Sequence, residues 1–398
     1  MSTDYPTAQP SPSSEGWDAR RVFEVALGVP ATEGNRVRIL RNGDEIFPPM
    51  LEAIGSAQRS VDLLTFVYWE GDIAADFAQA LAERAAAGVR VRVMLDHVGA
   101  RRIDEALVGL MLDSGCDVQW FRPVGGDASL GESLHRTHRK VLVCDGRVGF
   151  TGGVGIAEEW TGDARNPDEW RDTHFEVRGP AVDGLRSAFL RNWVESRRQL
   201  TDHNVDDFDT QPRAGESVVQ VLCDDDQSGV STTGFCFLLL LRGAESHVRI
   251  TTAYFTPDDD TLSEIIATRR RGVEVEILVP GEHGDKDFVK WASAGDFQEL
   301  LDAGVTVCTF DPAMLHTKVM TADSKVAIVG SSNVNSRSMS HDDEVMMVIF
   351  DEDLVRELDE DFASDQQRST VVDPEDWAKR GVIARMSEAV AGVVDDLL

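Results

Sequence analysis

The feature that most constrains the fold is an internal duplication, in which the stretches 60–96 and 247–281 show the same succession of patterns. Each begins with an apolar run that ends in aromatic residues. A helical pattern of apolar positions follows, and then a Gly-Val pair opens a run of alternating apolar and charged residues. The segments 110–121 and 300–310 match in the same way, at an offset of about 178 to 189 residues. The chain is therefore expected to consist of two equivalent halves.

Alternating strands and helices predict the α/β class. Because a strand joined to the next through a helix runs parallel to it, each half is expected to be an α/β domain with a mixed, largely parallel sheet. A pseudo-twofold axis would relate the two domains. The predicted organisation is a disordered leader and N-terminal arm (1–35), a first domain (36–200), a polar acidic linker (201–217), a second domain (218–366) and an amphipathic helical tail (367–398).

Length and composition fit this organisation. A chain of 398 residues with 42% hydrophobic and 27% charged residues can bury two domain cores. The first 16 residues lack the basic and apolar regions of a secretory signal, and no apolar run approaches the roughly 20 residues of a membrane-spanning helix. The five cysteines are scattered and never spaced as Cys-x-x-Cys, which favours a reducing, cytoplasmic setting without disulfides or structural zinc.

The net charge of −31 is the unusual bulk property. An acidic surface of this kind repels nucleic acid and anionic head groups and keeps a protein in solution. We interpret it as adaptation of the whole surface to high salt, in preference to an acid-tuned surface for one partner. Only six of the 39 basic residues are lysines, so the position of each lysine is informative.

Two of the six lysines belong to a motif that occurs once in each half. His138 and Lys140 lie two positions apart at an expected strand, and His316 and Lys318 repeat this spacing. Side chains two apart on a strand point to the same face, so each pair would project together. If the halves pack about a twofold axis, two imidazoles and two ammonium groups meet in one cleft. A single His-x-Lys would be an ordinary pair of exposed side chains on an edge strand, but two in matching places predict a shared site.

This group of side chains suits the cleavage of a phosphodiester. One imidazole attacks phosphorus and forms a phosphohistidine, while the other protonates the departing alcohol and then activates the acceptor. The two lysines would neutralise the phosphate oxygens, on which charge must be stabilised. The chemistry requires neither a metal nor a cofactor, and we predict none.

The pattern His-x-Lys-x4-Asp, present twice and followed by Gly-Gly or Gly-Ser-x-Asn, resembles that of the phospholipase D superfamily. The resemblance runs from about residue 36 through nearly the whole chain. Within the superfamily, four stretches are most similar to bacterial cardiolipin synthases: GNRVRILRNGDEIFPPMLEAIGSAQRSV, RTHRK, PDEWRDTHFEVRGPAV and NVNSRSMSHDDE. The resemblance implies that His138 and His316 are the nucleophile and general acid/base pair, with His138 as the nucleophile. Lys140 and Lys318 would bind phosphate.

The same resemblance assigns the residues around this quartet. Asn333 would donate its amide to the phosphate. Family enzymes hold each catalytic histidine through a carboxylate further along the chain, which fixes the imidazole tautomer. Asp145 and Asp323 close the two motifs and are expected to organise the turn after the strand. The predicted supporting residues are Asp172, Glu344, Ser331, Asp145 and Asp323.

One position departs from the family pattern. The first copy reads GGVG, so Gly155 stands where the family has an asparagine and where the second copy has Asn333. A lost hydrogen bond to a charged oxygen is worth roughly 1.5 to 3 kcal/mol. This reasoning predicts an active site in which the first copy supplies one fewer phosphate donor than the second. It also predicts that Gly155→Asn raises turnover.

Several other features suggest competing sites. The TGGVG segment lacks the lysine of a nucleotide-binding P-loop, and His135, His138 and Cys144 do not have the spacing of a zinc site. The three aspartates at 224–226 are typical of a solvated loop. His174 shares a strand face with Asp172, so it either lines the cleft or is a hydrogen-bonded core histidine.

The resemblance implies a phosphatidyltransferase that joins two phosphatidylglycerols into cardiolipin and releases glycerol. Many family members carry an N-terminal membrane pair that is not found here, so a cytoplasmic protein is expected to dock transiently on a membrane. A local rim such as Arg101 and Arg102, or the C-terminal tail, would make the contact. The alternatives are a hydrolytic phospholipase D, a nuclease, which the charge disfavours because nucleic acid is not an expected partner, and a lipid-binding module without activity.

Overall fold

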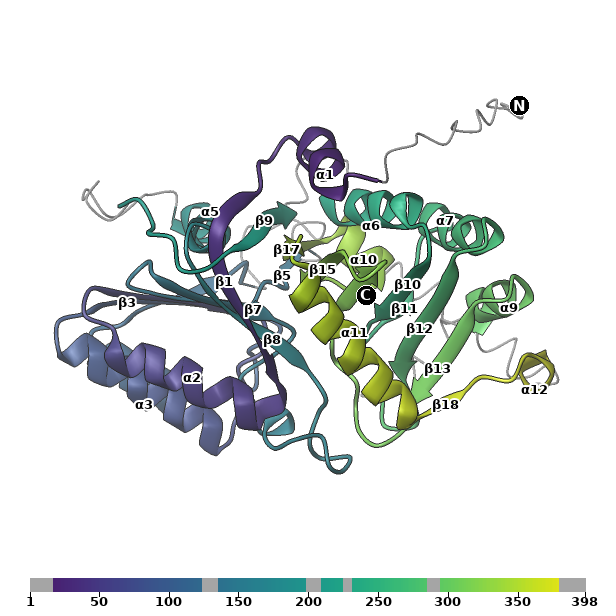
Figure 1. Cartoon of the computed structure of the whole chain (residues 1–398). Coiled ribbons are helices and arrows are strands. Elements are labelled where there is room, and N and C mark those ends of the chain that lie inside the picture. The colour runs from purple at the N-terminus through teal and green to yellow at the C-terminus, as the bar shows by residue number, and fades with distance from the viewer. Residues whose placement is uncertain (1–16, 124–134, 198–208, 225–230, 285–293, 379–398) are drawn as a thin grey trace.

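The structure is a computed structural model that describes residues 17–123, 135–197, 209–224, 231–284 and 294–378. It consists of two halves placed side by side (Figure 1). The elements of the first half are α1 (Ala19–Leu27), β1 (Thr32–Arg41), α2 (Asn42–Ser56), β2 (Ser60–Thr65), α3 (Asp72–Ala86), β3 (Arg90–Asp96), α4 (Glu105–Asp113), β4 (Asp117–Phe121), β5 (Arg136–Thr137), β6 (Val141–Cys144), β7 (Val148–Gly152), the 3-10 helix η1 (Glu158–Trp160), β8 (Thr173–Arg178) and α5 (Val182–Arg197).

The second half repeats much of this order. Its elements are β9 (Ser217–Asp224), α6 (Thr232–Gly243), β10 (His247–Thr251), β11 (Phe255–Thr256), α7 (Asp259–Arg270), β12 (Glu274–Pro280), α9 (Ala294–Asp302), β13 (Thr306–Phe310), β14 (Val319–Ala322), β15 (Val326–Gly330), β16 (Val334–Asn335), α10 (Ser336–Ser340), β17 (Asp342–Ile349), α11 (Glu352–Gln367), β18 (Ser369–Val371) and α12 (Pro374–Ala378).

One sheet runs through both halves. Its strand order is β18-β13-β12-β10-β14-β15-β17-β9-β1-β8-β7-β6-β2-β3-β4, and β1 pairs with β9 antiparallel at the centre. On either side of this centre the strands of the two halves follow in equivalent order. The predicted α/β class and mixed sheet are confirmed, and the two motif strands, β6 and β14, occupy equivalent places.

The prediction that the sheet is largely parallel is wrong. Along the sheet, parallel pairing is confined to β2-β3-β4 and β10-β12-β13, and the remaining neighbours pair antiparallel. The reason is a tight hairpin after each motif strand. Asp145 and Gly146 have φ values of 55° and 66°, and Asp323 and Ser324 have 56° and 53°. Two consecutive residues with positive φ are the signature of a type I′ turn, which reverses the chain within two residues.

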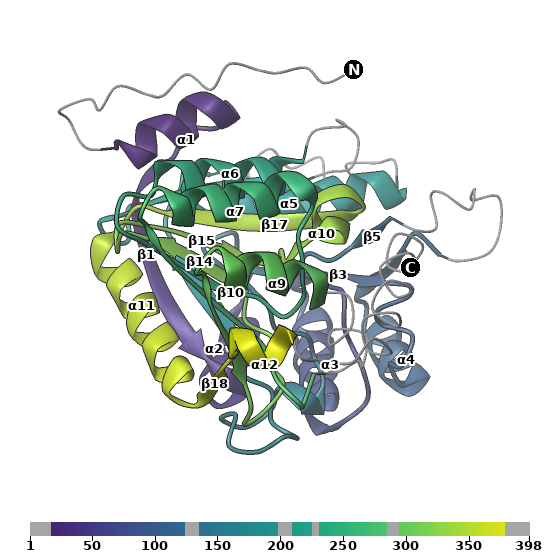
Figure 2. The ribbon, with the colours of Figure 1, turned by 90° about the vertical axis from the view of Figure 1, so that its right-hand side faces the viewer.

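Helices cover both faces of the sheet. On one face, α2, α3 and α4 cover the first half, and α6, α7 and α9 lie side by side over the second half (Figure 2). On the other face, α5 and α11 share one continuous apolar core with strands of both halves. The two halves therefore form a three-layer α/β/α body in which one of the two outer layers is common to both.

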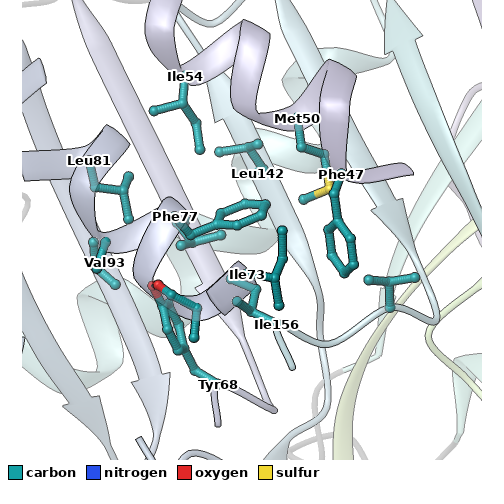
Figure 3. Close-up of a cluster of buried hydrophobic side chains, with 14 of the residues drawn as sticks. Phe47, Met50, Ile54, Tyr68, Ile73, Phe77, Leu81, Val93, Leu142 and Ile156 are labelled. Carbon is teal, nitrogen blue, oxygen red and sulfur yellow. The ribbon is translucent and has the colours of Figure 1, made fainter. Parts of the chain in front are cut away.

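Apolar spacing explains how these helices bind the sheet. In the first half, Phe47 and Ile54 of α2 face Phe77 of α3 across a buried cluster (Figure 3). The helices α3 and α7 both end before a glycine with positive φ, Gly88 at 88° and Gly272 at 97°. A glycine adopts this left-handed conformation without the steric cost that other residues meet, so it ends the helix and starts the next strand.

The predicted domain limits fall close to features of the structure. Strand β1 begins at Thr32, before the predicted limit at 36, and β9 begins at Ser217, the last residue of the predicted linker. Within the predicted arm, α1 packs its buried Phe23 against the core of the second half. Residues 1–16, residues 201–208 of the predicted linker and residues 379–398 of the predicted tail lie outside the described residues. Among the described helices, none has both the length and the apolar character needed to cross a bilayer.

Candidate active site

The two His-x-Lys segments lie immediately before β6 and β14, in extended chain that precedes the strand. Backbone hydrogen bonds from the opposite half hold both segments. The N–H of His138 donates to the carbonyl oxygen of Asp343 at 3.0 Å, and the N–H of His316 donates to that of Arg171 at 2.7 Å. The motifs are therefore anchored in each other's half, and all four histidine and lysine side chains are buried.

The two histidines pair with carboxylates in a crossed manner. Nδ1 of His138 lies 3.0 Å from Oε1 of Glu344, and Nδ1 of His316 lies 2.8 Å from Oδ2 of Asp172. Each imidazole therefore meets a carboxylate that belongs to the other half. Because an ionised carboxylate can only accept, the proton of each imidazole sits on Nδ1 and the lone pair on Nε2 is left for chemistry.

The lysines adjoin the same imidazoles. Nζ of Lys140 donates to the carbonyl oxygen of His138 at 2.8 Å, and Nζ of Lys318 donates to that of His316 at 2.5 Å. Lys318 also acts electrostatically on His138, and Lys140 on His316. These interactions across the halves mean that the structure brings the predicted quartet together.

Burial controls the protonation of this group. Burial and the neighbouring lysine together lower the pKa of His138 to about 4 and that of His316 to about 3, against the opposing effect of the paired carboxylate. Burial also lowers the pKa of Lys140 to about 7. Both imidazoles are thus neutral at neutral pH in the free protein, as a nucleophile requires. A bound phosphodiester would add the negative charge that favours protonation of the lysines and of one imidazole.

The carboxylates are buried but remain ionised. Asp172 is 0% exposed, and despite the opposing effect of burial its pKa lies below the usual range, because His316, Lys318 and the indole N–H of Trp160 stabilise the anion. Glu344 is also 0% exposed, and its pKa is lowered by His138 and Lys140 against burial. Two buried carboxylate anions therefore lie beside the histidines and lysines of the site.

Ser331 and Asn333 take different roles from each other. The hydroxyl of Ser331 donates to Oε2 of Glu344, so it holds the carboxylate of the His138 pair. The side-chain oxygen of Asn333 accepts from the hydroxyl of Thr252 at 3.5 Å. No hydrogen bond from the side-chain nitrogen Nδ2 of Asn333 is found among the described residues, and this group stays available for the predicted phosphate contact.

Asp145 and Asp323 lie in the hairpins that follow the motif strands. The carboxylate of Asp145 accepts from the backbone N–H groups of residues 58–60, which lead into β2. Asp323 accepts in the same way from residues 245–247, which lead into β10. Neither carboxylate contacts a motif histidine. Their geometry agrees with an organising role in the turn, and extends it to the chain that enters the neighbouring strand.

The space that the Gly155→Asn expectation requires is occupied. A Cβ atom at position 155 would lie 2.7 Å from Cβ of Val67 and 3.2 Å from the ring of Trp160. The first contact is closer than carbon atoms approach without a shift of the backbone, so an asparagine cannot simply be added.

We therefore revise the outcome expected for Gly155→Asn. The variant should lose about 1–3 kcal/mol of unfolding free energy through overpacking, and should not gain turnover. Urea unfolding at neutral pH measures the loss. Unchanged stability with higher turnover would contradict the revised expectation.

His174 neither lines an open surface nor finds a hydrogen-bond partner. It is 1% exposed, and neither ring nitrogen has a partner among the described residues. Burial and the charge of Lys140 lower its pKa to about 4, whereas the charge of Asp172 opposes this shift. The residue in the equivalent register of the second half is Met346, which pairs with Gly330 as His174 pairs with Gly152.

We predict that His174→Met makes the protein less sensitive to acid. Between pH 6.5 and about 4 the unfolded chain protonates this histidine and the folded chain does not, so its presence costs stability as the pH falls through that window. Unfolding midpoints in urea at pH 7.5 and pH 5 should differ less for the variant than for the unchanged protein. Burial raises the pKa values of Asp342 and Asp343 to about 7 and about 6, so these residues favour the folded state as the pH falls. Both proteins carry them, so their contribution is the same in each and cancels when the two differences are compared. An equal or larger difference for the variant would contradict the prediction.

Other residues of the site were missed by the sequence reasoning. The indole N–H of Trp160 donates to Oδ2 of Asp172 at 2.8 Å. Asn42, at φ 54°, donates its backbone N–H to the carbonyl of Asp172 and accepts from that residue's N–H. Arg136, just before the first motif, forms a buried ion pair with Asp96. The Asn-Gly pair at 42–43 could have signalled an unusual backbone, but no local signal marks the other partners.

Comparisons with known proteins agree with this geometry. A family model described as "Cardiolipin synthase, PLD-like domain" matches residues 50–165 and 237–366. Cardiolipin synthase 1 of Bacillus anthracis is 28% identical over 378 residues, which cover 93% of this chain and 74% of that protein. Cardiolipin synthase 2 of the same organism is 30% identical over 367 residues, with coverage of 91% and 70%.

A solved structure has the same fold. The phosphatidylserine synthase of Haemophilus influenzae Rd KW20 superposes with a TM-score of 0.70 at 14% identity, over 95% of this chain and 97% of that one. At this identity the likeness concerns the fold alone. The family model, in contrast, covers more than half of the chain and both motif segments. The resemblance predicted from the two motifs is confirmed, and the chain belongs to the family of cardiolipin synthase, PLD-like domains.

Proposed function

We propose that the protein is a phosphatidyltransferase that forms cardiolipin from two phosphatidylglycerols and releases glycerol. The observation that carries the proposal is the crossed pairing of two neutral imidazoles with two buried carboxylates, each imidazole beside a lysine. This arrangement supplies a nucleophile, a proton carrier and positive charge for a phosphodiester. The curated relatives in the comparisons bear the name cardiolipin synthase.

The reaction proceeds in two displacements. In the substrate complex His316 carries a second proton, on Nε2. Nε2 of His138 attacks phosphorus, the bond from phosphorus to the glycerol oxygen breaks, and His316 gives that oxygen its Nε2 proton and becomes neutral. The neutral His316 then takes the proton from a hydroxyl of a second phosphatidylglycerol, whose oxygen attacks phosphorus and breaks the bond to Nε2 of His138. Lys140, Lys318 and Asn333 bind the phosphate oxygens throughout. The pair is returned to its starting protonation state.

The substrate implies contact with a lipid surface, and one rim of the first half suits it. The guanidinium of Arg102 lies 4.1 Å from the ring centroid of Trp69, and Val98 and Leu112 on neighbouring segments are exposed by 36% and 51%. A cation stacked on an aromatic ring can bind an anionic interface locally. The same guanidinium lies 3.9 Å from Glu70 and 3.6 Å from Glu159, and it would exchange these surface ion pairs for an anionic head group. We include transient membrane docking at this rim in the proposal.

The decisive experiment incubates the purified protein with phosphatidylglycerol vesicles over a range of salt concentrations and separates the lipid products. Cardiolipin with an equal amount of glycerol is expected. Phosphatidic acid alone would make the protein a hydrolytic phospholipase D, and cleavage of DNA without any lipid product would make it a nuclease. Vesicle binding that persists without turnover would identify a lipid-binding module.

A further inference from the structure

The two carboxylates of the site are held by different donors. Oε2 of Glu344 accepts from the hydroxyl of Ser331, a residue of the Gly-Ser-x-Asn segment itself. Oδ2 of Asp172 accepts from the indole N–H of Trp160, the last residue of η1. That oxygen is also the partner of His316. Each carboxylate thus has one neutral side-chain donor, but the donors come from unrelated positions.

Equivalent positions explain why the donors differ. Ile156 forms a bridge with Tyr68 as Val334 pairs with Phe255, which fixes an offset of 178 residues over this segment. At this offset Gly153 corresponds to Ser331. A Cβ atom at Gly153 would lie 2.2 Å from Oδ1 of Asp172, so no side chain fits there. The first half has no room for the hydroxyl donor that the second half uses.

In the first half the donor to the carboxylate is Trp160, seven residues beyond Gly153. By the same offset it matches Ser338, a much smaller residue, and its ring reaches to 3.2 Å from a Cβ at Gly155. The indole stands edge-on to the His316 ring, with centroids 5.1 Å apart and planes at 87°. Trp160 is 2% exposed and is backed by Trp170 at a centroid distance of 4.3 Å.

We propose that Trp160 is a positioning residue for His316. Its indole N–H serves in the first half as the carboxylate donor that the Ser331 hydroxyl provides in the second half. The arrangement is consistent with glycine at positions 153 and 155, since a side chain at 153 would meet the Asp172 carboxylate and one at 155 would meet Val67 and the Trp160 ring. The inference rests on the roles of His316 and Asp172 in the proposed function. It makes the two imidazoles unequal, because only His316 lies against an indole that also holds its carboxylate.

The indole acts through the carboxylate. A donor on Oδ2 stabilises the anion of Asp172 and so weakens the pull of that oxygen on the Nδ1 proton of His316. Without the donor the Asp172 oxygen becomes more basic, and the hydrogen bond from His316 strengthens. His316 then gives up its proton less readily, which slows the step in which it acts as an acid.

The test replaces Trp160 by phenylalanine and, in a second variant, by the benzothienyl analogue of tryptophan, in which sulfur takes the place of the ring N–H. The analogue keeps the shape of the side chain and removes only the donor. Trp193→Phe is the matched control, because Trp193 is a buried tryptophan that stacks on Phe189 in the core on the opposite face of the sheet. The low-field proton resonance of His316 Nδ1–H, assigned through His316→Asn, is recorded at neutral pH beside the pH profile of kcat.

In both Trp160 variants the His316 resonance should move downfield. The alkaline limb of the kcat profile, which reports loss of the His316 proton, should move to higher pH. A fall in kcat of about tenfold or more with little change in KM is expected. The control should change neither quantity. An unmoved resonance would overturn the proposal, even with a lower kcat, since loss of activity alone is what a structural role would give. The resonance does not depend on turnover, so this test stands apart from failure of the proposed transfer reaction.

Discussion

Replacing His316 by asparagine is expected to lower kcat for phosphatidylglycerol by about 10²–10⁴-fold, because the departing glycerol oxygen loses its proton donor. His138→Asn is expected to abolish turnover through loss of the nucleophile. The two variants should separate on a phosphatidyl ester whose leaving group is nitrophenolate, which departs without a proton. His316→Asn should then release about one equivalent of nitrophenolate in a burst and stall as a phosphohistidine, whereas His138→Asn should give no burst.

The burst also tests the assignment of the nucleophile. A burst in His138→Asn and none in His316→Asn would reverse the two roles, and turnover that survives both substitutions would contradict the site. His174→Met is the matched control, because it removes a buried histidine from the same half and leaves both crossed pairs intact. It should retain the kcat of the unchanged protein.

The second large effect concerns stability. Asp96→Ala is expected to lower the unfolding free energy by about 3–5 kcal/mol, because it leaves the guanidinium of Arg136 buried without its carboxylate. Arg136 is 2% exposed, and Nε and Nη2 donate to Asp96 at 3.0 Å. The midpoint of urea unfolding at neutral pH provides the measurement.

Asp62→Ala is the matched control for this effect. Asp62 and Arg92 form a second buried pair at 2.7 Å, between β2 and β3, and the guanidinium lies over Phe189 of α5. Both variants should lose comparable stability. Only Asp96→Ala should also lower kcat below its unfolding temperature, because β5, which carries Arg136, pairs with β17 beside Glu344 and leads into His138. Equal kcat for the two variants would limit Asp96 to a structural role.

Much of the fold could be predicted because it depends on local periodicity. The duplicated apolar runs and the Gly-Val pairs predict the strands and helix ends of both halves, and Gly88 and Gly272 end the helices as expected. The direction of the motif strands was missed, although Asp145-Gly146 is a strong local hairpin signal. That error came from extending the strand-helix-strand rule to strands that no helix connects. The single continuous sheet depends on the β1-β9 pairing, which no pattern within either strand specifies.

For the site, the sequence by itself determined the chemical groups: two histidines and two lysines at one spacing, repeated in one chain, and the carboxylates Asp172 and Glu344 further along. Only the tertiary structure decided their partners. Each imidazole meets the carboxylate of the opposite half, and Trp160 fills the volume beside Gly155. The reason is physical: a repeated motif fixes which groups each half contributes, whereas contacts between halves and the sharing of buried volume arise only when the two halves pack together.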